Sequence, residues 1–152
     1  MPMQPEAPLQ LTDNGCCFVC GKDNPSGLKL QFRRVGDDEI ETEFTADPRF
    51  QGFEGIMHGG MTALLLDEVM VNLAWVKGLN AVSAELNVRL KKPVLTGQRV
   101  ILRGRIAGED RRIVRTEARA LTPAGEVLAE ATGTCIKMSN RKETPCRTST
   151  SK

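Results

Sequence analysis

The clearest chemical signal in the sequence is the triplet His58-Gly59-Gly60, which stands directly before a long apolar run. If that run is a helix, the triplet forms its start, where backbone N–H groups lack intrahelical acceptors and the helix dipole is positive. Glycine lets a carbonyl oxygen approach such N–H groups closely. The pattern favours a site that stabilises a negatively charged oxygen. A tight turn from loop to helix, without a ligand, is the alternative interpretation.

A carboxylate follows inside the same run. Asp67 lies nine residues after His58, which on a helix is ~13 Å along the axis. A carboxylate in an apolar helix is costly without a function or a partner, so Asp67 is either a candidate catalytic group or a structural residue bonded to backbone. Glu68, about 100° further around the helix, is the rival carboxylate. Asp67 cannot reach a ligand held at Gly59 of its own chain, so a common site requires a second subunit.

The motif Cys17-x-x-Cys20, with Cys16 beside it, is a candidate zinc or redox site. A structural zinc needs four ligands, and the chain offers few further sulfur or imidazole groups. These groups are Cys135, Cys146 and His58. A redox pair usually opens a helix in a βαβ unit, which the sequence does not indicate. We therefore expect no bound metal and no cofactor, and interpret the motif as a loop that packs small side chains near a pocket.

Composition restricts the class of protein. The chain has 152 residues, of which 40% are hydrophobic and 26% charged, as in one globular domain. The net charge of +2 gives no reason to expect a nucleic-acid partner, although a basic groove could hold a phosphorylated ligand. The N-terminus has neither a basic start nor an apolar stretch, and no apolar run approaches a membrane span. We expect a cytoplasmic protein without a membrane partner.

Apolar residues predict a helix over 61–76 that is apolar around nearly its whole circumference and is ended by Gly78. Alternation of apolar and polar residues predicts strands on both sides of this helix. The predicted strands span residues 28–33, 40–44, 82–91, 98–107, 112–121 and 126–138. Residues 1–14 are expected to be a mobile lead, 15–138 to form the domain, and 139–152 to be a disordered tail.

This order of two strands, one helix and four strands predicts an α+β domain. An antiparallel sheet wrapped around one central helix buries that helix on most sides. The open edge strand and the remaining face of the sheet need cover, and a second copy of the chain is the simplest source of it. We expect a homo-oligomer that is at least a dimer, with a tetramer favoured.

Four segments together form a more specific pattern. They are Cys17-Phe18-Val19-Cys20-Gly21 followed by Asn24-Pro25-Ser26-Gly27-Leu28; Gly55-Ile56-Met57-His58-Gly59-Gly60; Leu66-Asp67-Glu68; and Ala84-Glu85-Leu86-Asn87-Val88 leading to Lys92-Pro93. With the order of elements, they resemble the hotdog-fold thioesterases, and among these the PaaI-like acyl-CoA thioesterases. The resemblance covers roughly residues 15–138. It implies hydrolysis of a small, aromatic or medium-chain acyl-CoA to a carboxylic acid and CoA.

The resemblance also implies roles for individual residues. The N–H of Gly59 would stabilise the oxyanion, and Asp67 of the other subunit would act as nucleophile or general base. Ser83, sixteen residues after Asp67, stands where the family often carries Ser or Thr near the attacking water, but an ordinary strand serine fits almost as well. His58 would orient the loop or contact the thioester, or would be a structural histidine.

One position departs from the family pattern. Family members often carry Asn or Gln six residues before the histidine, where it helps to bind the carbonyl group or water. This chain has Gly52 there, with Gln51 next to it as a possible substitute and Glu54 as a further polar candidate. The departure concerns the hydrolytic mechanism and leaves the location of the site unchanged.

Several residues are candidates for substrate binding. A basic cluster near a strand end could contact the phosphates of CoA, or could simply be a solvated face. Gly60 and Glu68 border the catalytic candidates. The full set is Gly60, Gln51, Glu68, Arg89, Lys91 and Lys92.

Two other functions remain open from the sequence. The fold can hold an acyl-CoA without cleaving it, as a sensor or an assembly module, and Gly52 keeps this alternative in view. A hotdog dehydratase fits less well, because the His-Phe-Pro lead typical of those enzymes is absent.

Overall fold

The computed structural model describes residues 11–138. The predicted tail 139–152, with Cys146, and the first ten residues of the predicted lead lie outside the described residues. The strands are β1 (Arg33–Gly36), β2 (Glu39–Thr45), β3 (Ala81–Leu90), β4 (Arg99–Glu109), β5 (Ile113–Leu121) and β6 (Val127–Lys137), and the helix is α1 (Gly59–Val76). A short 3-10 helix spans Pro48–Phe50. This order confirms the predicted α+β class.

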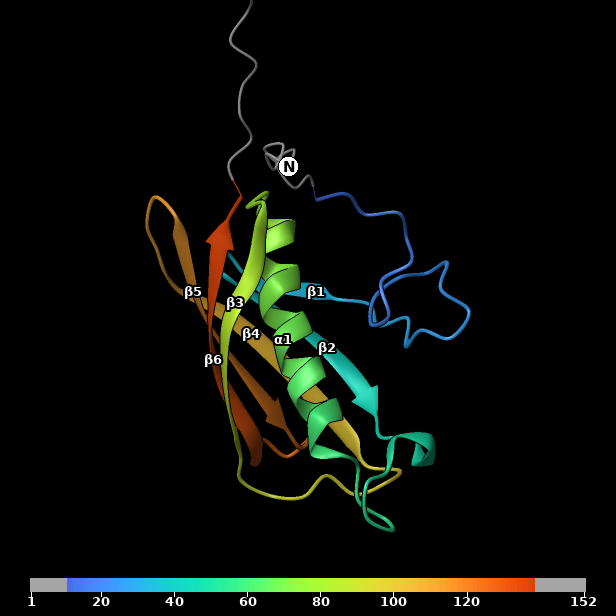
Figure 1. Cartoon of the computed structure of the whole chain (residues 1–152). Helices are drawn as coiled ribbons and strands as arrows, with labels where there is room; N and C mark the ends of the chain where they lie inside the picture. Colours follow the sequence, from blue (N-terminus) through green and yellow to red (C-terminus); the bar gives the residue numbers. More distant parts are fainter. Residues whose placement is uncertain (1–10, 139–152) are drawn as a thin grey trace, which may run out of the picture.

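All strands form one antiparallel sheet in the order β1-β2-β4-β5-β6-β3, and α1 lies across one of its faces (Figure 1). The helix buries one stripe of side chains against the sheet. The stripe consists of Thr62, Leu65, Leu66, Val69, Met70, Leu73 and Ala74. Trp75 and Val76 remain exposed in a single chain, so burial is more one-sided than the apolar sequence led us to expect. By length and composition alone α1 could cross a membrane, but its buried stripe is that of a core helix.

Two glycines let α1 approach the sheet closely. A Cβ atom on Gly104 of β4 would lie 3.1 Å from both the carbonyl oxygen and a methyl group of Val69. A Cβ atom on Gly133 of β6 would lie 2.8 Å from Thr116 Oγ1 and 3.2 Å from the Met70 sulfur. Larger residues at these positions would lift the helix, because protein interiors are close-packed. The two glycines therefore set the height of α1 above the sheet.

The first strand is shorter than predicted. Residues 28–32 do not belong to β1, because Leu28 and Leu30 donate their backbone N–H groups to the carbonyls of Phe18 and Val19, at 2.9 Å each. Lys29 between them has a φ of 55°, which is incompatible with an extended strand. The segment is thus tied to the cysteine-bearing loop, and alternation of apolar residues alone could not reveal this.

Strand β3 forms one edge of the sheet and contains a bulge. Ser83 pairs with Cys135, whereas Glu85 pairs with Thr134, so one extra residue stands in β3. The bulge brings Ser83 to the face that carries Leu90 and packs on α1. Strict alternation would have placed these two residues on opposite faces.

We expect Gly104→Val to lower the free energy of unfolding by ~1–3 kcal/mol, because the new side chain overlaps Val69 and forces α1 to shift. Gly108→Val is the matched control on the same strand, since a Cβ atom there would meet only the end of Arg115, at 3.6 Å. Urea unfolding of both variants measures the difference. Equal losses in the two variants would show that close approach of the helix is not what requires Gly104.

Candidate active site

The start of α1 is held by its own N-cap residue. His58 Nδ1 accepts a hydrogen bond from the N–H of Gly60 at 2.9 Å, and the His58 carbonyl accepts one from Met61 at 2.9 Å. The N–H of Gly59 has no acceptor among residues 11–138. A helix start with one free N–H can stabilise a developing negative charge. The imidazole thus has a structural contact, and the N–H of Gly60, a predicted binding group, is already engaged.

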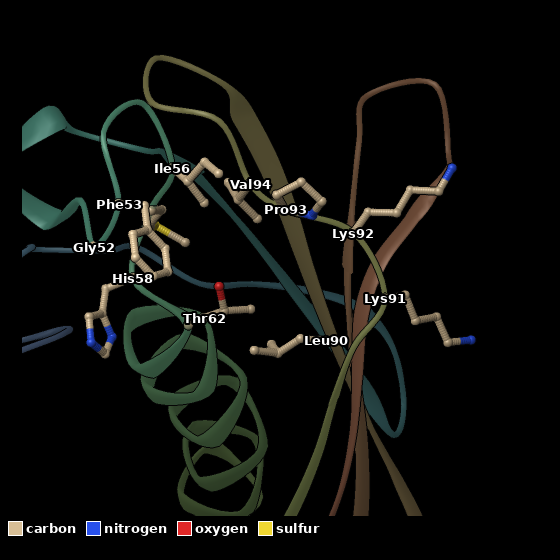
Figure 2. A pocket seen from close by; sticks show the side chains of 12 residues that line it. Gly52, Phe53, Ile56, His58, Thr62, Leu90, Lys91, Lys92, Pro93 and Val94 are labelled. Carbon is tan, nitrogen blue, oxygen red and sulfur yellow. The ribbon is translucent and has the colours of Figure 1, made fainter.

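Gly59 lines a pocket of about 580 Å³ at this end of the helix. Much of the lining is apolar and comes from the loop before α1, from the end of β3 and from the segment that follows β3, as Figure 2 shows. The apolar lining residues are Phe53, Ile56, Met57, Leu90, Pro93 and Val94. A Cβ atom on Gly59 would lie 2.8 Å from the end of the Leu90 side chain. A side chain at this position would therefore push the end of Leu90 aside, and glycine leaves the helix start open toward the pocket.

The position that departs from the family pattern faces the capping histidine. Gly52 lines the pocket, and a Cβ atom there would contact His58 at 3.4 Å, so a side chain at this position fits beside the imidazole. Gln51 does not stand in for it, because its amide oxygen accepts the N–H of Gly55 at 3.3 Å and its side chain is exposed. The neighbouring Glu54 is also exposed.

The basic cluster divides between two places. Lys91 and Lys92 line the Gly59 pocket, and in Figure 2 their side chains extend on the side opposite to His58. Both are paired with acids, Lys91 with Glu130 at 3.0 Å and Lys92 with Glu126. Lys91 holds the pKa of the Glu130 carboxyl below its usual range by hydrogen bonding.

Arg89 does not line the Gly59 pocket. It borders a separate depression together with Glu130, from which its guanidinium lies 3.9 Å. The structure thus brings two of the three predicted basic residues to the mouth of the Gly59 pocket and leaves the third on a neighbouring surface.

Asp67 lies in a second hollow, further along α1. Ser83 donates its hydroxyl to Asp67 Oδ1 at 2.6 Å. The β3 bulge makes this contact possible, because it turns Ser83 toward the helix. The hollow measures about 800 Å³ and also includes Glu68, Val71 and Trp75. Asp67 therefore has a side-chain partner of its own, and within residues 11–138 no hydrogen bond engages its second carboxylate oxygen.

Glu68 points to a different partner. Cys17 lies with its sulfur 3.7 and 3.8 Å from the two carboxylate oxygens of Glu68, and Cys20 lies in the same cluster. Burial raises the pKa of the Cys20 thiol well above its usual range, and Glu68 raises it further. Cys135, considered as a zinc ligand in the sequence, lies instead in a small core cluster with Ala74 and Val114. The sequence offered no signal for the contact between Glu68 and the cysteine motif.

Within one chain the two candidate halves do not meet. Gly59 and Asp67 line separate pockets, and eight residues of helix separate them, or ~12 Å of axial rise. The first half offers a free N–H beside an apolar cavity, and the second offers a carboxylate with a hydroxyl. Sequence reasoning did not identify Phe53 and Ile56 as pocket residues, because segment 45–57 gave only a loop pattern, and it gave no signal for Val94 after the predicted strand.

Comparison with known proteins identifies the family of this chain. Residues 54–129 match the family model described as the thioesterase superfamily. A search of curated proteins gives no match. Among solved structures, a thioesterase superfamily protein is similar with a TM-score of 0.75 and 26% identity, over 86% of this chain and 72% of the other.

Two more distant structures share the fold. A hypothetical thioesterase from Streptococcus pneumoniae TIGR4, solved with coenzyme A, has a TM-score of 0.69 and 16% identity over 74% of this chain and 88% of the other. The PaaI protein of the E. coli phenylacetic acid degradation operon has a TM-score of 0.68 and 14% identity over 72% and 84%. The family match covers one half of the sequence, and the sheet and helix have the hotdog arrangement of these neighbours. The chain therefore belongs to the thioesterase superfamily.

Proposed function

We propose that the protein hydrolyses the thioester bond of an acyl-CoA at a site shared by two subunits. The observation that carries this proposal is the free N–H of Gly59 beside an apolar pocket, with the Asp67 carboxylate in the middle of the same helix. An oxyanion donor and a carboxylate are the two groups that thioester hydrolysis needs.

The shape of the pocket supports an acyl substrate. Phe53, Ile56 and Val94 offer apolar contacts for a small, aromatic or medium-chain acyl group, and about 580 Å³ lies in the usual range for a ligand site. Lys91 and Lys92 at the mouth are placed to meet phosphates, which would compete with their present carboxylate partners. The Streptococcus pneumoniae protein, which has a similar fold, was solved with coenzyme A, and smu.793 of Streptococcus mutans was solved with acetyl CoA. Both structures support this class of ligand.

The free edge of β3 supports a homodimer. Leu86 and Leu90 on this edge strand are 38% and 54% exposed, and an apolar edge left open invites pairing with another strand. Ser83 contacts the Asp67 half-site, and Leu90 contacts the Gly59 half-site. The extra residue at the bulge takes no separate position in strand pairing. If two β3 strands pair antiparallel about Asn87, the Ser83 end of one strand therefore lies opposite the Leu90 end of its copy. Each Asp67 then faces the Gly59 of the other subunit.

The geometry supports a simple course for the reaction. The thioester carbonyl oxygen accepts the N–H of Gly59, and Ser83 holds one oxygen of Asp67 so that the other faces the carbonyl carbon. Asp67 either removes a proton from a water molecule that attacks this carbon, or attacks it directly to form an anhydride that water then hydrolyses. In both cases the C–S bond breaks and the CoA thiolate takes up a proton. The acid product and free CoA leave the site.

A non-catalytic acyl-CoA-binding protein is the second candidate, because Gly52 lacks the amide that family members often carry. The two functions differ in one measurable respect. An enzyme releases free thiol from acyl-CoA, whereas a binding protein retains the intact thioester over hours.

Asp67→Asn is expected to lower thiol release from a panel of acyl- and aroyl-CoAs by ~10²–10⁴-fold, because the amide keeps the shape and the Ser83 contact but is no base. Glu109→Gln, which removes an exposed carboxylate paired with Lys137, is the control and should retain native rates. Native rates in Asp67→Asn would remove Asp67 from the mechanism. Tight binding of intact acyl-CoA by the native protein, without any thiol release, would favour the binding function instead.

Gly59→Pro is expected to lower kcat by ~10²–10³-fold, because it removes the proposed oxyanion donor. Proline is well tolerated at the first position of a helix, and the ψ of 132° at His58 suits a residue before proline. Gly59→Ala is the matched control, since it adds the same Cβ atom beside Leu90 but keeps the N–H. Equal losses of kcat in the two variants would assign the effect to crowding and not to the N–H.

A mixed dimer tests whether the site is shared. A heterodimer of a Gly59→Pro chain and an Asp67→Asn chain, purified through two different tags, is expected to recover about half of the native activity, because one of its two sites is intact. A native chain paired with a chain carrying both substitutions should be inactive, since each site then lacks one group. The reverse pattern, with no recovery in the first pair and half activity in the second, would place the whole site in one chain.

A further inference from the structure

The cysteine motif and Glu68 form a cluster that the proposed hydrolysis does not use. The sulfur atoms of Cys17 and Cys20 and a carboxylate oxygen of Glu68 all lie within 4.8 Å of one another. All three residues are partly buried. The two cysteines come from the loop before β1, and Glu68 comes from the middle of α1. Three side chains that can bind a metal, from two distant parts of the sequence, therefore lie close together.

The spacing suits one tetrahedral metal ion. With Zn–S bonds of about 2.3 Å and Zn–O bonds of about 2.0 Å, tetrahedral geometry separates a sulfur and an oxygen ligand by about 3.5 Å and two sulfur ligands by about 3.8 Å. The observed distances from Cys17 to the Glu68 oxygens are 3.7 and 3.8 Å. The Cys17–Glu68 distances are therefore close to ligand spacing, and the whole cluster, with all ligand atoms within 4.8 Å, would need to contract to reach it.

The loop is already shaped around the first sulfur. Gly21 donates its N–H to the Cys17 carbonyl at 2.9 Å, and Val19 donates its N–H to Cys17 Sγ at 3.4 Å. A Cβ atom on Gly21 would lie 2.4 Å from both the backbone nitrogen and oxygen of Cys17, so only glycine permits this turn. The hydrogen bond from Val19 fixes the position of the Cys17 sulfur. Such contacts to a ligand atom orient it and support metal binding.

We propose that Cys17, Cys20 and Glu68 bind one zinc ion. Two thiolates select a soft or borderline cation such as zinc over magnesium or calcium. The hollow that also contains Asp67 adjoins the cluster and leaves space for water as the fourth ligand. This inference runs against our expectation from the sequence, which counted only cysteine and histidine as partners for the motif. It does not depend on the proposed hydrolysis.

The ion would tie the loop to the helix. Glu68 is next to Asp67 in the chain, so a metal at this point anchors the loop that covers one side of the Asp67 hollow. The role is structural, because no reacting group of the proposed mechanism is a ligand.

The full chain, purified under reducing conditions without a histidine tag, is expected to contain about one zinc per chain by elemental analysis. Exchange for Co²⁺ should give the visible bands of a tetrahedral site and thiolate-to-cobalt charge transfer in the near ultraviolet. Cys20→Ser and Glu68→Gln should each lower zinc affinity by at least ~10-fold. Cys135→Ser, which changes a buried cysteine outside the cluster, is the matched control and should retain the metal.

Three results would overturn the proposal. They are a substoichiometric metal content in the native chain, a Co²⁺ spectrum that persists in Cys20→Ser, and a Cys17–Cys20 disulfide in place of the metal in freshly purified protein. Thermal unfolding with and without a chelator keeps the test independent of variants that fold poorly, because the native chain alone must lose stability when zinc is removed. None of these measurements uses thiol release, so failure of the zinc site and failure of the hydrolase proposal are distinguishable.

Discussion

The close contact of α1 with the glycines of the sheet governs the rest of the molecule. The helix carries Gly59 at its first position and Asp67 in its middle, so any shift of the helix displaces both. A Cβ atom on Gly104 would lie 3.1 Å from the Val69 carbonyl oxygen, and one on Gly133 would lie 3.2 Å from the Met70 sulfur, so a larger residue at either position would crowd the helix. The glycines have no functional group of their own. They matter because they lack a side chain, and the helix occupies the space that a side chain would fill.

The sequence predicts the fold well because the fold rests on long apolar patterns. Six segments of alternating residues and one long, mainly apolar run allowed few arrangements of strands and helix, and the predicted order of elements is the observed one. The exception is the region around Lys29, where backbone hydrogen bonds to Phe18 and Val19 replace strand pairing. Such contacts join segments that are adjacent only after folding, so the local pattern does not contain them.

Part of the site was predictable because some of its residues are unusual at their positions in the sequence. His58, Gly59 and Asp67 are visible in the sequence because their types are unusual at the start and in the middle of an apolar helix. Ser83 was visible only through the resemblance, since its contact with Asp67 depends on a bulge, and a bulge leaves no mark in an alternating pattern. The apolar pocket residues and the contact of Glu68 with Cys17 were not predictable, because both depend on where a loop folds back over the helix.

Gly59 and Asp67 lie apart on the same helix, and this separation has a consequence for the proposed enzyme in the cell. If the site is shared between subunits as proposed, a single chain holds both chemical groups but no complete site, and hydrolysis begins only when two copies pair. At low concentration the activity would then rise with the square of the amount of polypeptide. Such a protein would be inactive when dilute and active when abundant.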